Sequence, residues 1–279
     1  MKINSPQLNL MHKACMKASK VLIRDFGEIE KLQVSEKGPG DFVTASDKRV
    51  EKIIINELNV ENSKYSVLCE EKGELIGKNK EKRWIIDPID GTTNFLNGLP
   101  HFAISIAYEE KGEILSGIIF DPIKNEMFFA EKGQGAYLNN TRTRVSNKAD
   151  FKNSLLVTGG PRYTSNIKDK VFKEYIELTK KVRPTIRKSG SAALDLAYVA
   201  AGRFDGSWPR ELKYWDIAAG IIILQESGGF INNLIGDNYL QDKIDIVATN
   251  SKLHKIGSAS GRESVYISVV GGSLKNKTN

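Results

Sequence analysis

The 279-residue chain has few cysteines and no long apolar run. Its two cysteines, Cys15 and Cys69, cannot form a metal site of the CxxC type, and sparse cysteine is typical of a reducing compartment. No stretch approaches the length that spans a bilayer, and residues 1–6 lack the apolar core of a signal peptide. These absences predict a cytoplasmic protein without a membrane segment or a structural disulfide.

The chain also lacks a clustered basic patch, although it is basic overall. Its 41 lysines and arginines against 34 acidic residues give a formal net charge of +7. Clustered basic residues would supply nonspecific affinity for nucleic acid, but the lysines here are scattered and are not interleaved with aromatic residues. A solvated, lysine-rich surface is the favoured interpretation, while nucleic-acid binding and attraction of a small anionic substrate stay open.

Hydrophobic periodicity predicts a layered α/β fold. Helices are expected over residues 6–26, 44–58, 168–181, 191–201 and 215–226. Strands are expected over residues 66–69, 83–86, 102–108, 114–120, 125–130, 136–138, 155–158 and 245–249, with 182–187 extended. Residues 34–41 and 72–82 are expected to be loops. Helices that are interleaved with strands are typical of stacked layers.

The chain shows no internal repeat and no clear linker. We expect a single domain over residues 1–256, with sub-domains of about 1–150 and 151–256 that share one cleft, because the composition shifts near residue 150. No helical pattern follows Asn250, and residues 257–279 are rich in Gly, Ser and Lys. A poorly packed tail is therefore expected there.

Chemically useful side chains are concentrated in residues 83–95. An apolar run predicts a strand, and Asp87 and Asp90 follow it directly. Pro88 prevents the strand from continuing as a helix, and Gly91 permits a sharp turn. The next three residues can begin a helix with free backbone N–H groups. Carboxylates bind hard divalent cations and helix N-termini bind phosphate, so this stretch predicts metal-assisted phosphate chemistry.

Further carboxylates fall at comparable places. Glu70 ends a predicted strand, and Asp216 begins a predicted helix, as Asp47 also does. Each has a structural explanation, because acids are common at exposed strand ends and in first helical turns. Asp216, however, precedes a nearly all-apolar helix, where a carboxylate must be hydrogen-bonded, ion-paired or metal-bound. A metal site shared with the pair at 87 and 90, and a set of separate structural acids, remain as alternatives.

Two longer motifs resemble the signatures of the inositol monophosphatase family. The first is Trp-Ile-Ile-Asp-Pro-Ile-Asp-Gly-Thr-Thr-Asn-Phe at residues 84–95. The second is Trp-Asp-Ile-Ala-Ala-Gly-Ile-Ile-Ile-Leu-Gln-Glu-Ser-Gly-Gly at residues 215–229. Supporting matches, in the family's order, are residues 41–47, 70–71 and 190–195. The resemblance covers the chain from the first helix to Asn250 and is closest to the bacterial branch.

The resemblance implies a fold, an activity and partners. The fold would be an αβαβα sandwich of the inositol monophosphatase and fructose-1,6-bisphosphatase type. The activity would be that of a Mg²⁺-dependent phosphomonoesterase, which hydrolyses inositol 1-phosphate or a similar small phosphate monoester by attack of a metal-activated water. Family members are usually homodimers. Bacterial members have also been linked to RNA and transcription complexes, so a binding role is a further alternative.

The resemblance also implies a role for each matching residue. Two or three Mg²⁺ ions would be bound by the following set: Glu70, Asp87, Asp90, Asp216 and the backbone carbonyl of Ile89. Glu70 and Thr92 would orient the attacking water, with Asp47 supporting the threonine. The substrate and its phosphate would contact a second set: Asp90, Gly91, Thr92, Gly190, Ser191 and Ala192.

One position departs from the family pattern. Inositol-specific members usually place a glutamate, which accepts hydrogen bonds from substrate hydroxyls, where this chain has Pro209. The proline side chain cannot accept a hydrogen bond, and Glu211 lies two residues further on. The metal chemistry is therefore predicted to be intact while the substrate stays open. Sister activities on fructose 1,6-bisphosphate, histidinol phosphate or a nucleotide 3′-phosphate are the alternatives.

Overall fold

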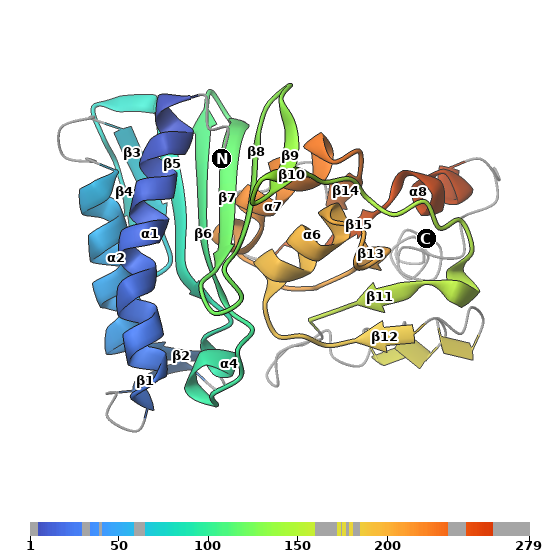
Figure 1. Ribbon diagram of the computed structural model, residues 1–279, viewed down its shortest axis with the longest axis horizontal. Helices are drawn as coiled ribbons and strands as arrows, with labels where there is room; N and C mark the ends of the chain where they lie inside the picture. The colour runs from blue at the N-terminus through green and yellow to red at the C-terminus, as the bar shows by residue number, and fades with distance from the viewer. Residues whose placement is uncertain are drawn as a thin grey trace, which may run out of the picture.

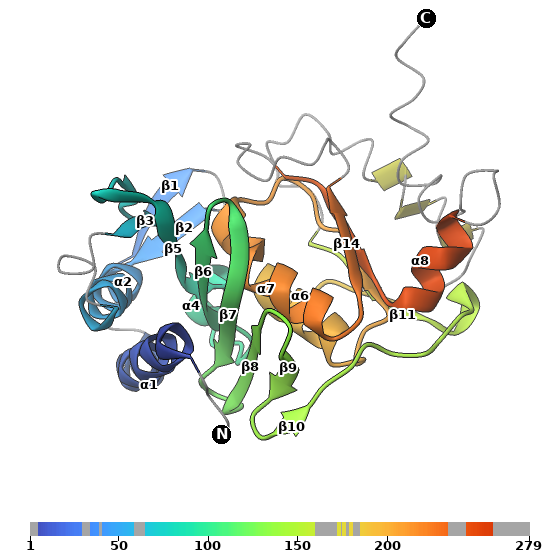
Figure 2. The same cartoon turned by 90° about the horizontal axis from the view of Figure 1, so that it is seen from above.

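The computed structural model describes residues 5–29, 34–38, 41–58, 65–159, 172–173, 175–176, 179–180, 185–233 and 244–258. These residues form five stacked layers (Figure 1). Helices α1 (Pro6–Phe26) and α2 (Ala45–Glu57) cover one face of an eight-stranded sheet. Helices α6 (Ala192–Ala200) and α7 (Tyr214–Glu226) lie between this sheet and a five-stranded sheet, and α8 (Ser251–Ser258) lies outside the latter (Figure 2). The predicted αβαβα sandwich is confirmed.

The eight-stranded sheet has the order β10-β9-β8-β7-β6-β5-β3-β4. Its strands are β3 (Tyr65–Cys69), β4 (Gly73–Leu75), β5 (Asn79–Asp90), β6 (Ala103–Glu110), β7 (Glu113–Asp121), β8 (Glu126–Glu131), β9 (Gly135–Leu138) and β10 (Thr141–Arg142). All neighbours are antiparallel except β3 and β5, which run parallel with Cys69 opposite Ile86. The carboxyl ends of parallel strands meet at one edge of a sheet. The residues that follow Cys69 and Ile86 are Glu70 and Asp87, so this pairing places the two carboxylates side by side.

The five-stranded sheet has the order β12-β11-β13-β15-β14 and completes the layers. Its strands are β11 (Leu155–Val157), β12 (Thr185–Arg187), β13 (Gly206–Ser207), β14 (Phe230–Asn233) and β15 (Ile246–Thr249). Strand β11 is parallel to both of its neighbours, and the other pairs are antiparallel.

Three apolar cores fill the spaces between the layers, because successive side chains of a strand point to opposite faces. On β5, Trp84 and Ile86 pack towards α1 and α2, whereas Ile85 packs towards α6 and α7. Beyond the five-stranded sheet, a third core includes Trp208 and Leu253 of α8. The eight-stranded sheet is thus buried on both faces. In the described part of the chain, no helix is long and apolar enough to cross a membrane.

Several predicted elements are confirmed, and three expectations are wrong. Helix α1 has the predicted bounds, with Ser5 as its N-cap. The two expected loops are partly strands: residues 34–38 and 41–44 form the antiparallel pair β1 and β2, and β4 and the start of β5 lie within residues 72–82. A helix also follows Asn250, since α8 runs to Ser258.

Two other expectations concern residues that the structure does not fully describe. Most of the helix predicted over residues 168–181 lies outside the described residues. The predicted tail lies outside them from residue 259 onward, and residues 257–258 belong to α8.

Gly117 of β7 is expected to tolerate no side chain, because α7 approaches it closely. A Cβ at this position would lie 2.9 Å from the Cα of Ala219. Gly117→Ala should therefore destabilise the fold by about 1–3 kcal/mol through overpacking, measured by urea unfolding. Gly27→Ala is the control, since its φ of −74° suits alanine and its Cβ would only touch Arg24 O at 3.4 Å. Equal stability of the two variants would contradict the close approach of α7.

Candidate active site

The site begins where β5 breaks its pairing with β6. Asp87 lies opposite Ser105 and Asp90 opposite Ala103, so β5 carries one extra residue between the two aspartates. The Asp87 carboxylate accepts a hydrogen bond from Ile89 N at 3.0 Å, which closes a tight local turn. This turn projects both carboxylates from the end of the strand, as the sequence predicts.

Gly91 then allows the chain to enter the short helix α4 (Thr92–Leu96). Its φ is +101°, and a Cβ there would lie 3.1 Å from His101 O and 3.3 Å from Gly190 O. Only glycine combines this left-handed backbone with so little space. The close approach brings the loop before α6 against the end of β5.

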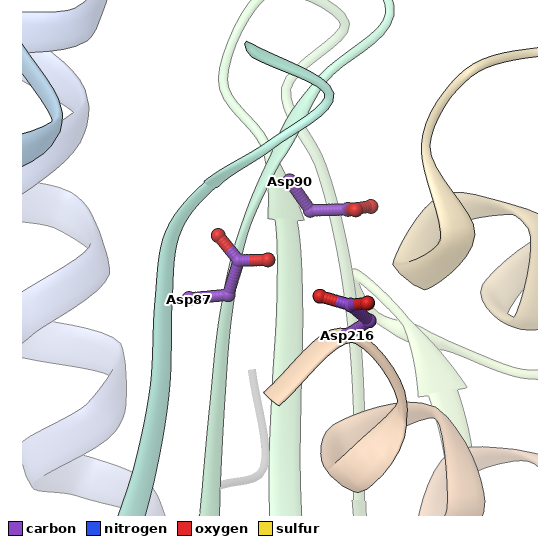
Figure 3. A group of neighbouring side chains, drawn as sticks. All are labelled: Asp87, Asp90 and Asp216. Atoms are coloured by element: carbon purple, nitrogen blue, oxygen red, sulfur yellow. The ribbon is translucent and has the colours of Figure 1, made fainter. Parts of the chain in front are cut away.

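Three carboxylates converge at this point (Figure 3). Asp87 and Asp90 come from the end of β5, and Asp216 comes from the first turn of α7. One oxygen of each lies within 4.8 Å of the others. Lys213 N donates a 2.8 Å hydrogen bond to Asp216 Oδ2, which fixes this carboxylate to the start of its helix. The structure thus brings Asp216 to two carboxylates that precede it by 126 and 129 positions in the sequence, so that one cation could contact all three.

The electrostatics of the cluster favour a bound cation. Burial raises the pKa of Asp87 well above its usual value, and the negative charges of Glu70, Asp90 and Asp216 raise it further. Burial also raises the pKa of Asp90 to about 6, although hydrogen bonds from Ser191, Ala193 and Ala192 oppose this shift. Buried carboxylates that repel one another are stabilised by a divalent cation between them, and all-oxygen ligands suit Mg²⁺. The donor set therefore fits the implied metal.

The loop before α6 contacts Asp90 in a way that the sequence analysis missed. The Ser191 hydroxyl donates a hydrogen bond to Asp90 Oδ2. Ala193 N donates to the same oxygen at 2.8 Å, and Ala192 N donates to Oδ1 at 3.3 Å. The predicted substrate-side residues therefore also orient a predicted metal ligand. Ser191 is the N-cap of α6, and a serine before an apolar helix is the sequence feature that indicates such a cap.

Thr92 connects the turn to α2. Its hydroxyl donates to Ile89 O at 3.0 Å and lies 3.5 Å from Asp47 Oδ1. Asp47 is fully buried in the first turn of α2. The structure thus agrees with the helix-start explanation of Asp47 and also places it in contact with Thr92.

A cavity of about 510 Å³ opens over the cluster. Its wall contains every predicted site residue except Asp47: Glu70, Asp87, Ile89, Asp90, Gly91, Thr92, Gly190, Ser191, Ala192 and Asp216. Pro209 and Glu211 also line it, together with Arg210 and Lys188. The cavity volume is typical of a pocket for a small molecule. The departure at Pro209 therefore lies where it can affect a ligand.

Two further cavity residues, Asn94 and Asp195, were given no role in the sequence analysis. Asn94 Nδ2 donates to Ser189 O at 2.8 Å and to His101 O at 2.7 Å. The Ser189 hydroxyl donates to Asp195, a carboxyl whose pKa is raised well above its usual value by burial. Asn94 and Asp195 thus hold Ser189 from both sides. Both belong to the quoted motifs, but neither has a spacing that predicts this contact.

The chain is similar to known proteins over most of its length. A model described as "Inositol monophosphatase family" matches residues 4–265. An inositol-1-monophosphatase of Mesorhizobium japonicum is 43% identical over 251 residues, which are 90% of this chain and 94% of the relative. A protein of Escherichia coli named Nus factor SuhB is 39% identical, with 92% of this chain and 96% of the relative covered.

The fold is also similar to that of solved structures. The extragenic suppressor protein suhB from Bartonella henselae superposes with a TM-score of 0.85 at 44% identity, covering 90% of this chain and 96% of that one. An IMPase of Thermotoga maritima superposes with a TM-score of 0.80 at 34% identity, covering 96% and 99%.

Proposed function

The chain belongs to the inositol monophosphatase family, and from this we propose that it is a Mg²⁺-dependent phosphatase of small phosphate monoesters. Inositol 1-phosphate is the first candidate substrate. The observation that carries the proposal is the convergence of Asp87, Asp90 and Asp216 within 4.8 Å on one cavity. A cluster of acids without a cation would be electrostatically costly, and a cation site at a cavity wall suits an anionic ligand.

The residues that would hold two or three Mg²⁺ ions are Glu70, Asp87, Asp90, Asp216 and the carbonyl of Ile89. Glu70 lines the same cavity, and its charge acts on Asp87, which supports its inclusion. When bound, the ions would neutralise the carboxylates, lower the pKa of a coordinated water and stabilise charge on the phosphate oxygens.

The chain's own residues would position the reactants. The backbone amides of Gly91 and Thr92 would bind the phosphate, and the loop of residues 190–192 would contact the rest of the substrate. Glu70 would accept a hydrogen bond from the attacking water, and Glu70 and Thr92 Oγ1 together would orient that water. Thr92 can accept a hydrogen bond from the water while its own proton is donated to Ile89 O or Asp47 Oδ1.

A substrate panel tests the proposal. Phosphate release would be measured at saturating Mg²⁺ from inositol 1-phosphate, fructose 1,6-bisphosphate, histidinol phosphate and a nucleotide 3′-phosphate. We expect at least one to be hydrolysed, and Pro209 in the cavity wall is the reason to include the last three. Binding of Mg²⁺ without hydrolysis of any of them would contradict the catalytic role.

The second candidate function is the RNA or transcription-complex binding role that the resemblance implies. It is favoured by the relative named Nus factor SuhB and by the net charge of +7. Expression of an Asp87→Asn variant in a deletion strain separates the two roles. Restoration of growth by this inactive variant would favour binding, whereas failure to restore growth would favour catalysis.

The assembly and location remain part of the proposal. We propose a cytoplasmic homodimer with one phosphatase domain over residues 1–256. Analytical ultracentrifugation of the full chain checks the dimer, and a monomer at micromolar concentration would exclude it.

Mg²⁺ affinity should fall as the pH is lowered below about 6. Burial raises the pKa of Asp90 to about 6 and that of Asp87 well above its usual value. Below these pKa values the carboxylates carry protons that must leave before a cation binds, so affinity should drop about tenfold or more per pH unit. Calorimetric titrations between pH 5 and 8 measure this slope, and a pH-independent affinity would exclude these two ligands.

A further inference from the structure

A buried hydrogen-bond network connects the first residue of α7 to the large sheet. Tyr214 starts α7, two residues before Asp216, and its hydroxyl donates to Glu109 Oε2 at 2.6 Å. The other oxygen of Glu109 accepts hydrogen bonds from Arg83 Nη2 at 2.7 Å and Nε at 3.0 Å. Tyr214 and Glu109 are both buried, and the Arg83 guanidinium lies 5.6 Å from the Tyr214 ring centre.

The network reaches the same strand that carries the other carboxylates. Arg83 and Glu109 are directly opposite each other on β5 and β6, and Arg83 lies on the same face of β5 as Asp87, four residues later. Tyr214 therefore fixes the start of α7 to the strand from which Asp87 and Asp90 project. Because Lys213 N binds Asp216 Oδ2, the Asp216 carboxylate moves with this first turn.

Apolar packing holds the middle of α7 close against the sheet at Gly117, whereas the first turn of α7 also has a directional contact. Helix α7 is buried along most of its length by aliphatic side chains, whose contacts are non-directional. A hydrogen bond between two buried side chains is directional, and leaving either group without its partner is costly. We propose that Tyr214 and Glu109 are positioning residues that hold Asp216 at the distance from Asp87 and Asp90 that a divalent cation needs. This inference rests on the proposed function of the cluster.

The test is Mg²⁺ binding by Tyr214→Phe, measured by isothermal titration calorimetry in the absence of substrate. The variant keeps the ring and removes the hydroxyl. Loss of a direct hydrogen-bond partner of a metal ligand typically weakens metal binding about 10–100-fold, and the Tyr214 hydroxyl acts on Asp216 through the first turn of α7, so we take about 10-fold, the lower end of that range. We expect a weaker Mg²⁺ affinity of that size and a raised Mg²⁺ concentration for half-maximal activity. We expect kcat at saturating Mg²⁺ to stay within about threefold of the wild-type value, because no reacting group is removed.

Tyr108→Phe is the matched control. Tyr108 is the neighbour of Glu109 on β6, its hydroxyl donates to Glu110 Oε2 at 2.9 Å, and its ring packs in the core towards α1 and α2. The Tyr108→Phe variant therefore also loses a tyrosine–glutamate hydrogen bond, but the tyrosine ring lies on the face of the sheet away from α7. We expect unchanged Mg²⁺ affinity for this variant, even where its melting temperature falls as much as that of Tyr214→Phe.

Three outcomes test the positioning role of Tyr214 separately from the proposed function. Equal Mg²⁺ affinity of wild type and Tyr214→Phe would overturn the positioning role while leaving the proposed function intact. No Mg²⁺ binding by the wild type would overturn both. Should Tyr214→Phe not fold, Glu109→Gln keeps the side-chain shape; its Mg²⁺ affinity must also fall, and an unchanged value would overturn the inference.

Discussion

Asp87→Asn is expected to abolish phosphate release and, at the same time, to raise the melting temperature of the metal-free protein. The loss follows because Asp87 is central to the proposed cation site, and a bound cation supplies several kcal/mol of transition-state stabilisation. That amount corresponds to a fall in kcat of about 10³-fold or more. The activity would be measured as phosphate release at saturating Mg²⁺.

The gain in stability follows from the raised pKa of Asp87. A carboxyl whose pKa is higher in the folded state contributes stability below its unfolded pKa, and this contribution is lost as the pH rises through the folded value. Above the unfolded-state pKa, placing this carboxyl in the folded protein therefore costs free energy, whereas asparagine does not titrate. The difference in melting temperature between variant and wild type should widen as the pH rises, and added Mg²⁺ should stabilise only the wild type.

Asp205→Asn is the control for a buried aspartate outside the site. Its carboxylate, directly before β13 of the five-stranded sheet, accepts hydrogen bonds from Lys148 Nζ at 3.1 Å and Leu155 N at 2.7 Å. This variant should show the opposite pattern, with a lower melting temperature and unchanged kcat. Should Asp87→Asn instead lose stability and keep its activity, the cluster would be structural and the proposed function would be wrong.

The sequence predicts the turn at residues 87–91 because the relevant information is local. Pro88 fixes its own φ angle, and Gly91 can adopt a positive φ angle, whatever residues surround them. The position of Glu70 beside Asp87 depends instead on the parallel pairing of β3 with β5, and no short-range pattern specifies that register. Its strand-end position left Glu70 as one candidate for a shared metal site, and the resemblance to a family assigned it there.

The missed elements are ones that tertiary contacts create. Strand β4 has only three residues, and it is a strand because Leu75 lies opposite Val67 of β3. Helix α8 has eight residues, and Leu253 packs it against the five-stranded sheet. The start of α8 is capped by Asn250, whose Oδ1 accepts hydrogen bonds from the backbone N–H groups of residues 252 and 253. Asparagine is a common N-cap, so this helix start could have been predicted from the sequence.

The contacts that organise the site were the least predictable part. The motif around Asp90 predicts that it is a metal ligand. Its hydrogen bonds from Ser191 and Ala193, however, join residues about a hundred positions apart in the sequence. Tyr214 is likewise an unremarkable aromatic before a helix until β6 brings Glu109 to it. The residue types at the site are enough to predict that it binds a metal ion. The hydrogen bonds that orient those residues form only when the layers pack together, so the sequence does not predict them.

Thr92→Val is expected to lower kcat by about 10²–10⁴-fold, the usual contribution of a group that positions a proton in the transition state. Valine has the shape of threonine without its hydroxyl, so the bond to Ile89 O and the contact with Asp47 are both lost. Because no carboxylate changes, Mg²⁺ affinity by calorimetry should fall far less than in Asp87→Asn, by at most the roughly 10–100-fold that loss of the hydrogen bond to the Ile89 carbonyl would cause. This combination distinguishes Thr92→Val from Asp87→Asn, which loses both properties.

Two variants isolate the hydroxyl as the cause. Thr92→Ser keeps the hydroxyl and should retain most of the activity, while Thr141→Val changes an exposed threonine of β10 that does not line the cavity and should retain kcat. Full activity of Thr92→Val would mean that the hydroxyl only closes the turn over Ile89. Asp47 would then be a first-turn helix acid and nothing more, and Asp47→Asn would lower the melting temperature without lowering kcat.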